Sequence, residues 1–279
     1  MTRNTAIANH LDGLDHIVLA VRDLDASAAA WRNAGFTLSP RGTHSEYLGT
    51  GNHTIMLRDD YVELLGVLKP TDFNAPTRAF LDRAEGLERL AMRTIDAKAA
   101  VETLRAEGRA VEGPFHFSRP VDLPGRPDAV AAFDIFQWPA EQAVEGARLF
   151  SCQHLTRDTV WLPSLITHEN GATDLLRLDR RSSTPEASAR LHAEVTGGEA
   201  VQVQGGWEIA ATGRGPVVRY LEAAAFTEIW GADCAPDCGA LFAVVDETRA
   251  ATFARARPGK GDAALTADVP GARLAFRQG

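Results

Sequence analysis

The pattern of apolar and polar positions near the start of the chain predicts a strand, a helix and then three more strands. In chain order these are a strand at residues 14–21, a helix at 26–34, and strands at 36–39, 53–57 and 60–67. Asp23 or Asp25 is a candidate N-cap for the helix, and Gly35 is a candidate stop. The Gly-rich segment 49–52 predicts a turn before the second of the three strands.

The same order of elements is predicted to recur along the rest of the chain. A second set comprises a strand at 87–92, a helix that begins at Asp96 and ends near 107, and strands that begin at 110, 129 and 148. Its Pro- and Gly-rich insertion at 114–127 predicts a long loop or a bulged hairpin. A third set begins at residue 173 with a helix at 185–195, and a shorter fourth set begins at 240. Repetition on this scale indicates an array of similar structural units.

Two polar residues interrupt otherwise apolar predicted strands, His16 in the first and Glu63 in the strand at 60–67. A buried carboxylate is costly unless a cation or a strong donor accompanies it. A histidine and a glutamate on neighbouring strands could therefore share a metal ion. The alternatives are a hydrogen-bonded core histidine and a glutamate in a salt bridge. A register slip of one residue would turn either side chain to the other face.

Several of these segments together resemble the vicinal oxygen chelate superfamily, and specifically its glyoxalase-like members. The resemblance is carried by residues 14–24, Gly35–Phe36, 49–52 and 61–65, and by the connector 161–172. It implies an α+β fold in which tandem βαβββ units form a curved mixed sheet around a cleft. The second unit matches through its element order, and the C-terminal half matches in outline.

The resemblance implies four segments. These are a disordered tail at 1–12, an N-terminal glyoxalase-like domain at 13–158 with units 13–70 and 86–156, a connector at 159–172, and a degenerate glyoxalase-like domain at 173–279. The C-terminal domain offers no comparable pair of ligands and is expected to cover the cleft or to mediate dimerisation. The pairs His168–Glu169 and His192-x-Glu194 are expected to face solvent.

The resemblance also implies a metal site, because the superfamily takes its ligands from the first and fourth strands of each unit. In this chain those positions hold His16 and Glu63 in the first unit, and Arg89 and His154 in the second. Arginine stays protonated and cannot bind a metal. The implied ligands are therefore His16, Glu63 and His154, a set that suits Fe²⁺, Mn²⁺, Ni²⁺ or Zn²⁺.

Four residues are predicted to bind substrate, namely Arg89, Asn52, His53 and Tyr61. Arg89 could hold a substrate carboxylate or phosphate in a bidentate contact. It could instead pair with Glu63, which would abolish the metal site. Asn52 could also serve only the turn. Cys152, two residues from His154, could add a ligand, although a small buried hydrophobe is the simpler interpretation.

The implied function is that of a divalent-metal-dependent lyase or isomerase acting on a small substrate with two adjacent oxygens. Glu63 would be the catalytic base, since a metal-bound carboxylate can move a proton in glyoxalase-type members. One alternative is a non-haem Fe²⁺ ring-cleaving dioxygenase. Another is a protein without catalysis that sequesters a small molecule in the same cleft.

Composition narrows the expected location and partners. The net charge of −8 argues against nucleic acid as a partner, and no apolar stretch is long enough for a membrane helix. The first dozen residues lack the apolar core of a signal peptide. Three cysteines are too few for a disulfide framework, and Cys234 and Cys238 are expected to be plain thiols. We therefore expect a cytoplasmic protein that could form a homodimer and whose partner is a small-molecule substrate.

Overall fold

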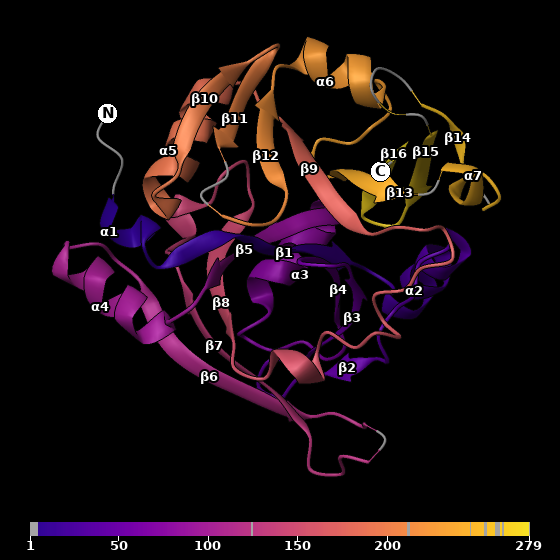
Figure 1. Cartoon of the computed structure of the whole chain (residues 1–279). Coiled ribbons are helices and arrows are strands. Elements are labelled where there is room, and N and C mark those ends of the chain that lie inside the picture. Colours follow the sequence, from indigo (N-terminus) through magenta and orange to yellow (C-terminus); the bar gives the residue numbers. More distant parts are fainter. Residues whose placement is uncertain are drawn as a thin grey trace.

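Two eight-stranded mixed sheets with the same strand order make up the protein, one above the other in Figure 1. The computed structural model describes residues 5–123, 125–210, 213–245, 247–253, 256–259, 263 and 265–278. The strands of the first sheet are β1 (Leu11–Val21), β2 (Gly42–Thr43), β3 (Thr50–Met56), β4 (Tyr61–Val67), β5 (Gly86–Thr94), β6 (Glu112–Pro120), β7 (Val130–Gln137) and β8 (Arg148–His154). Those of the second are β9 (Asp174–Arg181), β10 (Glu199–Val203), β11 (Gly206–Ala210), β12 (Val217–Leu221), β13 (Gly239–Val245), β14 (Arg257–Pro258), β15 (Leu265–Val269) and β16 (Ala272–Gln278).

The strand order confirms the predicted α+β class and the tandem βαβββ units. The first sheet runs β2-β3-β4-β1-β5-β8-β7-β6, and the second runs β10-β11-β12-β9-β13-β16-β15-β14. In the first sheet β1 is parallel to β4 and antiparallel to β5, and β5 is parallel to β8. The first strands of two units therefore lie side by side at the centre of each sheet. Residues on β1, β4, β5 and β8 share one curved surface.

Seven α-helices cover the sheets, and two of them begin at the aspartates predicted as caps. They are α1 (Thr5–Ala8), α2 (Leu24–Asn33), α3 (Ala75–Arg83), α4 (Ala97–Ala106), α5 (Pro185–Thr196), α6 (Ala223–Trp230) and α7 (Glu247–Ala250), with 3₁₀ turns at Ala140–Gln142 and Arg157–Thr159, all within the described residues. The Asp23 carboxylate accepts a hydrogen bond from Ala26 N, and that of Asp96 from Ala99 N, each at 2.9 Å. Such contacts satisfy backbone donors that a helix start leaves free.

The predicted hairpin at the Pro- and Gly-rich insertion is present. β6 and β7 pair in antiparallel register, with an irregularity between Glu112 and Phe115. In Figure 1 these strands run down to the lowest point of the molecule. The hairpin therefore forms one wall of the first sheet rather than an unstructured loop.

Several local predictions were wrong. Residues 36–39 do not form a strand. Ser39 is hydrogen-bonded to Thr54 of β3 through its backbone N and its hydroxyl, but no ladder of backbone hydrogen bonds follows. Asn52 lies inside β3 and not in a turn. Residues 5–12 of the expected disordered tail are ordered, since α1 buries Ile7 and β1 begins at Leu11.

The two histidines expected to face solvent are both buried. His168 accepts a hydrogen bond from Thr37 N through Nδ1 at 3.0 Å, and its Nε2 donates to Met56 O at 2.8 Å. His192 is hydrogen-bonded through Nδ1 to the Tyr220 hydroxyl at 2.9 Å. Backbone and hydroxyl partners of this kind come from distant parts of the chain, so the local sequence did not reveal them.

The two sheets pack directly on each other, and one hydrophobic core includes residues of both. Leu87 N donates a hydrogen bond to Asp237 O at 2.8 Å across the contact. Gly86 has a φ of +145°, and a Cβ there would lie 1.9 Å from Asp237 O. Only glycine therefore permits this approach of β5 to the second sheet.

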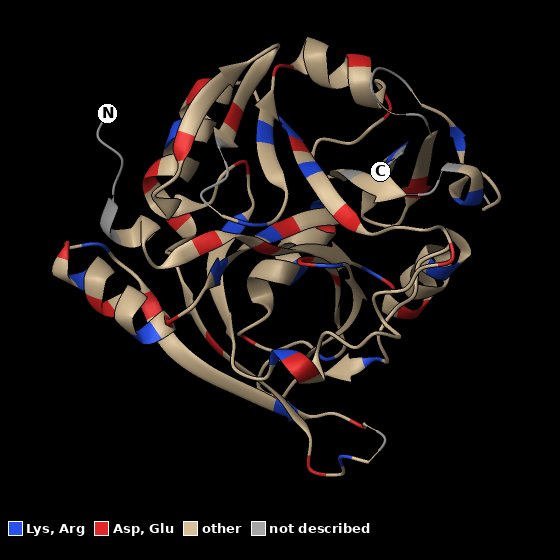
Figure 2. Ribbon diagram, in the orientation of Figure 1, with Lys and Arg blue, Asp and Glu red and all other residues tan. Residues whose placement is uncertain are grey.

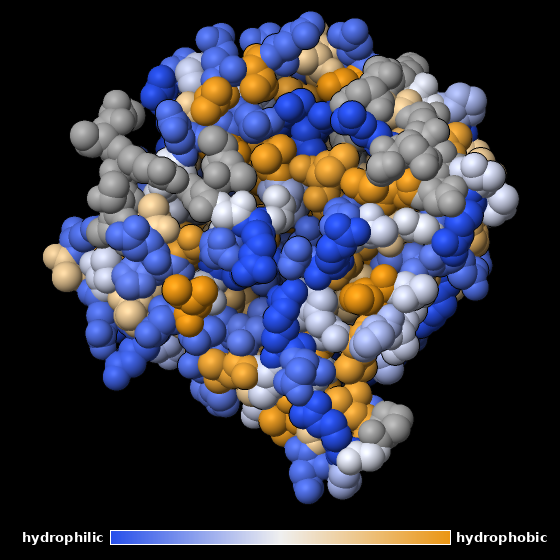
Figure 3. Space-filling view, in the orientation of Figure 1, coloured by the Kyte–Doolittle hydropathy of each residue, from blue (hydrophilic) through white to orange (hydrophobic). Residues whose placement is uncertain are grey.

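Charged residues of both signs are mixed along the ribbon (Figure 2), and apolar residues on the same face occur in separate groups among hydrophilic ones (Figure 3). Among the helices of the described residues, none is long and apolar enough to span a membrane.

Candidate functional site

The curved first sheet and its β6–β7 wall surround a cavity of about 420 Å³. Most of its lining is apolar, with a smaller set of polar and charged side chains. The apolar set is Leu48, Leu65, Phe73, Phe117, Phe133, Ile135 and Phe150, and the chemically reactive or charged set is His16, His44, Tyr61, Glu63, Arg89, Arg119 and Cys152. An apolar cavity with a few convergent polar groups is the usual form of a small-molecule site.

His16 is held in position by its neighbour Asp15. Asp15 Oδ2 lies 2.7 Å from His16 Nδ1, and Asp15 is fully buried. The pairing of β1 with β5 shifts register between Leu14 and His16, so that Asp15 is an extra residue in the ladder. Such a bulge re-aims side chains that would otherwise alternate. With Nδ1 bonded to Asp15, His16 directs its Nε2 to Glu63 at the cavity.

Asp15 is a hub of charged contacts that the sequence analysis did not identify. Its Oδ2 also lies 2.9 Å from His154 Nε2, and its Oδ1 accepts a hydrogen bond from Arg93 Nε at 3.2 Å. Burial acts to raise the pKa of Asp15, but the charges and hydrogen bonds of His154 and His16 outweigh it and lower that pKa well below its ordinary value. Asp15 is therefore an anion. The feature of the sequence that could have identified Asp15 is an aspartate within an otherwise apolar predicted strand.

Glu63 faces His16 across the junction of β4 and β1, as the sequence analysis anticipated. Glu63 Oε2 lies 3.7 Å from His16 Nε2. Its other oxygen, Oε1, accepts a hydrogen bond from Asn52 Nδ2 at 2.8 Å. Asn52 Oδ1 is buried and has no hydrogen-bond partner in the described part of the chain. Asn52 thus orients the carboxylate from β3, although it does not itself line the cavity.

His154 lies beside this pair but does not line the cavity. Its Nε2 bonds to Asp15, and its Nδ1 is buried with no partner among the described residues. The rings of Phe133 and Trp161 pack edge-on against it, at 5.0 and 4.8 Å between centroids. The structure therefore brings His16 and Glu63 into contact, and joins His154 to His16 through Asp15.

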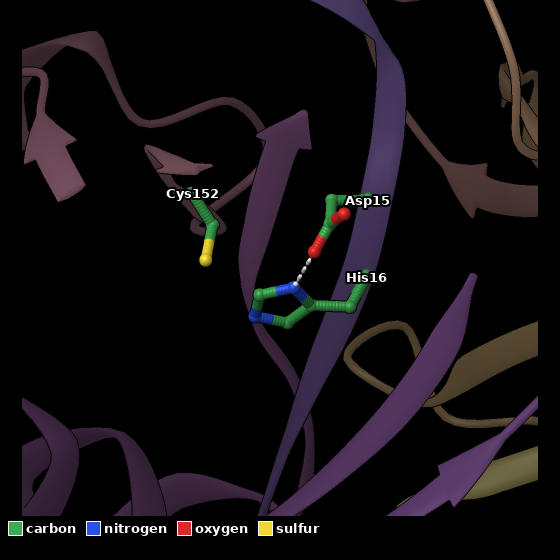
Figure 4. A group of neighbouring side chains, drawn as sticks. All are labelled: Asp15, His16 and Cys152. Carbon is green, nitrogen blue, oxygen red and sulfur yellow. Dashed lines mark hydrogen bonds and ion pairs between the residues drawn. The ribbon is translucent and has the colours of Figure 1, made fainter. Parts of the chain in front are cut away.

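Cys152 adds a third potential ligand near His16. Asp15, His16 and Cys152 each present a ligand atom within 4.8 Å of the others, and Figure 4 shows the sulfur and the carboxylate on two sides of the imidazole ring. Burial raises the pKa of the Cys152 thiol well above its ordinary value, with Asp15 and Glu63 adding to the effect. Cys152 is consequently a neutral thiol at neutral pH unless a cation binds beside it.

Tyr61, predicted to bind substrate, lines the cavity and stacks on His16 with 4.2 Å between ring centroids. Burial raises the pKa of Tyr61 well above its ordinary value, so the phenol keeps its proton. His53, also predicted to bind substrate, is buried on the other side of β3. Its Nδ1 is 2.8 Å from Ser39 O, and it is not among the residues that line the cavity.

Arg89 lines the cavity, but its ion pair is with its neighbour Glu88 and not with Glu63. Arg89 Nε lies 2.6 Å from Glu88 Oε2, and its Nη2 donates to Thr77 Oγ1 at 3.1 Å. Arg148 pairs with the same carboxylate. The alternative in which Arg89 neutralises Glu63 is therefore not the arrangement in this structure.

The second sheet has different chemistry at the corresponding place. On β9, Arg177 Nε lies 2.8 Å from Asp179 Oδ1, and Trp230 Nε1 donates to Asp179 Oδ2 at 2.9 Å. Cys234 and Cys238 are free thiols. Arg177, Asp179 and Trp230 are not among the residues that line the cavity.

Comparison with known proteins identifies the class. A family model described as a glyoxalase-like domain matches residues 14–196, more than half of the chain. The chain belongs to this glyoxalase-like family of the vicinal oxygen chelate superfamily. No curated protein matches it in sequence.

Solved structures with TM-scores above 0.5 share its fold. A hypothetical protein from Staphylococcus aureus superposes with a TM-score of 0.71 at 14% identity, over 95% of this chain and 98% of that one. A fusion protein of a xylose isomerase-like TIM barrel and a 4-hydroxyphenylpyruvate dioxygenase gives 0.52 at 14% identity, over 89% of this chain and 39% of that one. Methylmalonyl-CoA epimerase from Mycobacterium tuberculosis gives 0.37 at 23% identity, over 51% of this chain and 88% of that one.

The residues at the cavity fit the divalent metal that the superfamily implies. Two ligand atoms bound to one ion at about 2.1 Å each lie at most about 4.2 Å apart. The 3.7 Å between His16 Nε2 and Glu63 Oε2 is within that limit. A carboxylate that accepts from the second nitrogen of a ligating histidine is the usual support for such a ligand, and Asp15 fills that role.

Proposed function

We propose that this protein is a divalent-metal-dependent enzyme of the lyase or isomerase type that acts on a small substrate with two adjacent oxygens. The observation that carries the proposal is the His16 Nε2–Glu63 Oε2 pair at the wall of an apolar cavity. Each partner is held in position by a hydrogen bond at its other polar atom. Asp15 orients His16, and Asn52 orients Glu63.

His16 and Glu63 would hold the ion. The third ligand proposed from the sequence is His154, through its unpartnered Nδ1. Cys152 is the alternative, since its sulfur lies within 4.8 Å of the ligand atoms of His16 and Asp15, a group that does not include His154. Fe²⁺, Mn²⁺, Ni²⁺ and Zn²⁺ all accept imidazole with carboxylate. When bound, such an ion would supply Lewis acidity to the substrate oxygens.

Glu63 is the proposed catalytic base. Its Oε1 accepts from Asn52, so Oε2 would hold the ion through one lone pair and would use its other lone pair to take a proton from a carbon that bears one of the substrate oxygens. The same atom can return that proton to a neighbouring carbon, which completes an isomerisation. Tyr61 keeps its proton and lines the same cavity, so its hydroxyl can donate to an oxygen that gains charge.

Proton exchange tests this proposal. The metal-reconstituted protein is incubated in D₂O with dihydroxyacetone and 2-hydroxyacetophenone, and NMR follows deuterium entry at the carbon that bears the hydroxyl group. Glu63→Gln should slow the exchange by about 10²–10⁴-fold. The control Glu141→Gln, an exposed carboxylate of the same half, should leave it unchanged. Equal exchange in Glu63→Gln would refute the base assignment.

Oxygen uptake separates the alternatives. Consumption of O₂ with catechol, without deuterium exchange, would favour the ring-cleaving dioxygenase. The sequestering alternative would have been supported by an Arg89–Glu63 pair, whereas Arg89 pairs with Glu88. Tight binding of these compounds with neither deuterium exchange nor O₂ consumption would favour the sequestering alternative.

A further inference from the structure

Arg119 is a cavity-lining cation with no ion pair or side-chain hydrogen bond among the described residues. The other arginine in the lining, Arg89, is ion-paired with Glu88 at 2.6 Å and shares that carboxylate with Arg148. The carboxylate of Glu63 is also committed, to Asn52 and His16. Arg119 therefore presents an unpaired guanidinium group to the cavity.

The position of Arg119 on the β6–β7 hairpin explains why no acid neutralises it. Phe117 and Arg119 are two residues apart on β6, so their side chains share the inner face, and both line the cavity. Across the ladder Phe117 pairs with Phe133, whereas Arg119 pairs with Ala131, whose side chain has no acceptor. On the outer face of the same hairpin the opposite holds, because His116 Nδ1 lies 2.7 Å from the cross-strand Asp134.

Arg119 lies at the same end of the cavity as Glu63. A Cβ placed on Gly42 would be 2.2 Å from Asn52 Oδ1 and 3.6 Å from Arg119 Cζ. Asn52 in turn donates to Glu63 Oε1 at 2.8 Å. The guanidinium is thus separated from the proposed base by one amide side chain.

His44, which also lines this end, does not compete for an anion. Its Nδ1 is 2.7 Å from Thr50 Oγ1. Burial is the main cause that lowers the pKa of His44, and the charges of Arg119 and Arg89 add to it against the attraction of Glu63. His44 is therefore neutral at pH 7, and Arg119 is the cation that an entering anion meets.

We propose, on the basis of the function proposed above, that the substrate is a small carboxylic acid whose carboxylate binds Arg119. Its apolar body would lie against Phe117, Phe133 and Phe150, and its oxygenated carbon would face His16 and Glu63. A planar guanidinium holds a carboxylate through two parallel hydrogen bonds, which fixes orientation as well as affinity. The volume of about 420 Å³ is near the lower end for ligand sites and suits a single ring or a short branched chain.

Calorimetry with a matched pair of probes tests the proposal on chelator-treated protein. The probes are 3-phenyllactate and 3-phenyl-1,2-propanediol, which share the ring and the adjacent oxygens but differ in charge. The wild type should bind the acid at least about tenfold more tightly than the diol. Arg119→Gln should reduce this ratio to near one, and Arg119→Lys should retain part of it.

Arg126→Gln is the control, because Arg126 lies in the loop between β6 and β7 but is exposed and pairs with Asp158 at 2.7 Å. It should keep the wild-type ratio. Equal binding of the two probes by the wild type, no binding of the acid, or an unchanged ratio in Arg119→Gln would each overturn the proposal. Thermal melting of all variants identifies any loss of fold, and Arg119→Lys keeps the test valid if the glutamine variant is unstable.

Glu63→Gln separates this proposal from the proposed function. It should keep the preference for the acid while losing proton exchange. If the wild type prefers the acid but exchanges no proton, the acid site stands and the proposed reaction fails. If it exchanges protons without preferring the acid, only the acid site fails.

Discussion

Asp15 Oδ2 and His16 Nδ1 lie 2.7 Å apart, although adjacent residues of a regular strand project to opposite faces. The bulge at Asp15 in the pairing of β1 with β5 makes the contact geometrically accessible. The consequence is chemical, because a histidine bonded at Nδ1 to a carboxylate presents Nε2 as its free ligand atom.

Replacement of Asp15 should therefore weaken metal binding indirectly, through the loss of the hydrogen bond that orients His16. In Asp15→Asn we expect affinity for a divalent ion to fall by about 10–100-fold. Stability should fall by about 1–3 kcal/mol, because Arg93 loses its buried anion. Metal titration and urea unfolding measure the two effects. Asp12→Asn, on the same strand but in a more exposed pair with Arg214, should change neither.

Asp60 predicts a specific dependence of stability on pH. It is buried, its Oδ1 has no partner in the described part of the chain, and burial together with the nearby Asp174 raises its pKa to about 8. The folded state therefore binds this proton more tightly than the unfolded state, whose pKa is near 3.8. The contribution of Asp60 to stability is full below pH 3.8 and is lost as pH rises through about 8.

Asp60→Asn should accordingly stabilise the protein at alkaline pH, by about 2–5 kcal/mol at pH 9 relative to pH 5. Unfolding curves between pH 5 and 9 measure the difference from wild type. Asp25→Asn, at an exposed aspartate that pairs with Arg41, should give a difference that does not vary over this range. A constant difference for Asp60→Asn as well would contradict the raised pKa.

Glu88 is only 3% exposed and forms ion pairs with two arginines, Arg89 and Arg148. Glu88→Gln removes the charge and leaves both guanidinium groups without it, so the free energy of unfolding should drop by about 3–5 kcal/mol. The matched control is Glu186→Gln, which breaks the exposed pair with Arg190 and should cost no more than about 0.5 kcal/mol. Urea denaturation compares them directly, and similar losses would show that burial of Glu88 is not decisive.

Gly42 keeps open the space between Asn52 and Arg119. In Gly42→Ala the new Cβ would collide with Asn52 Oδ1, and the movable amide would shift away from Glu63. We expect proton exchange to slow by about tenfold, with little change in unfolding. If the effect passes through Asn52, the double variant with Asn52→Ala should be no slower than Asn52→Ala alone. Additive losses would indicate a separate cause.

The repeated units, the helix caps at Asp23 and Asp96, and the proximity of His16 and Glu63 could be predicted from the sequence. Each of these depends on local pattern or on regular alternation. The role of Asp15 was missed because a bulge breaks alternation, and bulges have no reliable local signal. The unpaired guanidinium of Arg119 was missed because it depends on which residue lies across the hairpin from Arg119.

The central claim is that His16 and Glu63 together bind a divalent ion, and elemental analysis of reconstituted, desalted protein tests it most directly. We predict about one equivalent of Fe, Mn, Ni or Zn in the wild type and in the control His116→Ala, whose histidine is 60% exposed on the outer face of the hairpin. His16→Ala and Glu63→Gln should each lose that metal while remaining folded. Full occupancy in both folded variants, or no metal in the wild type, would contradict the account.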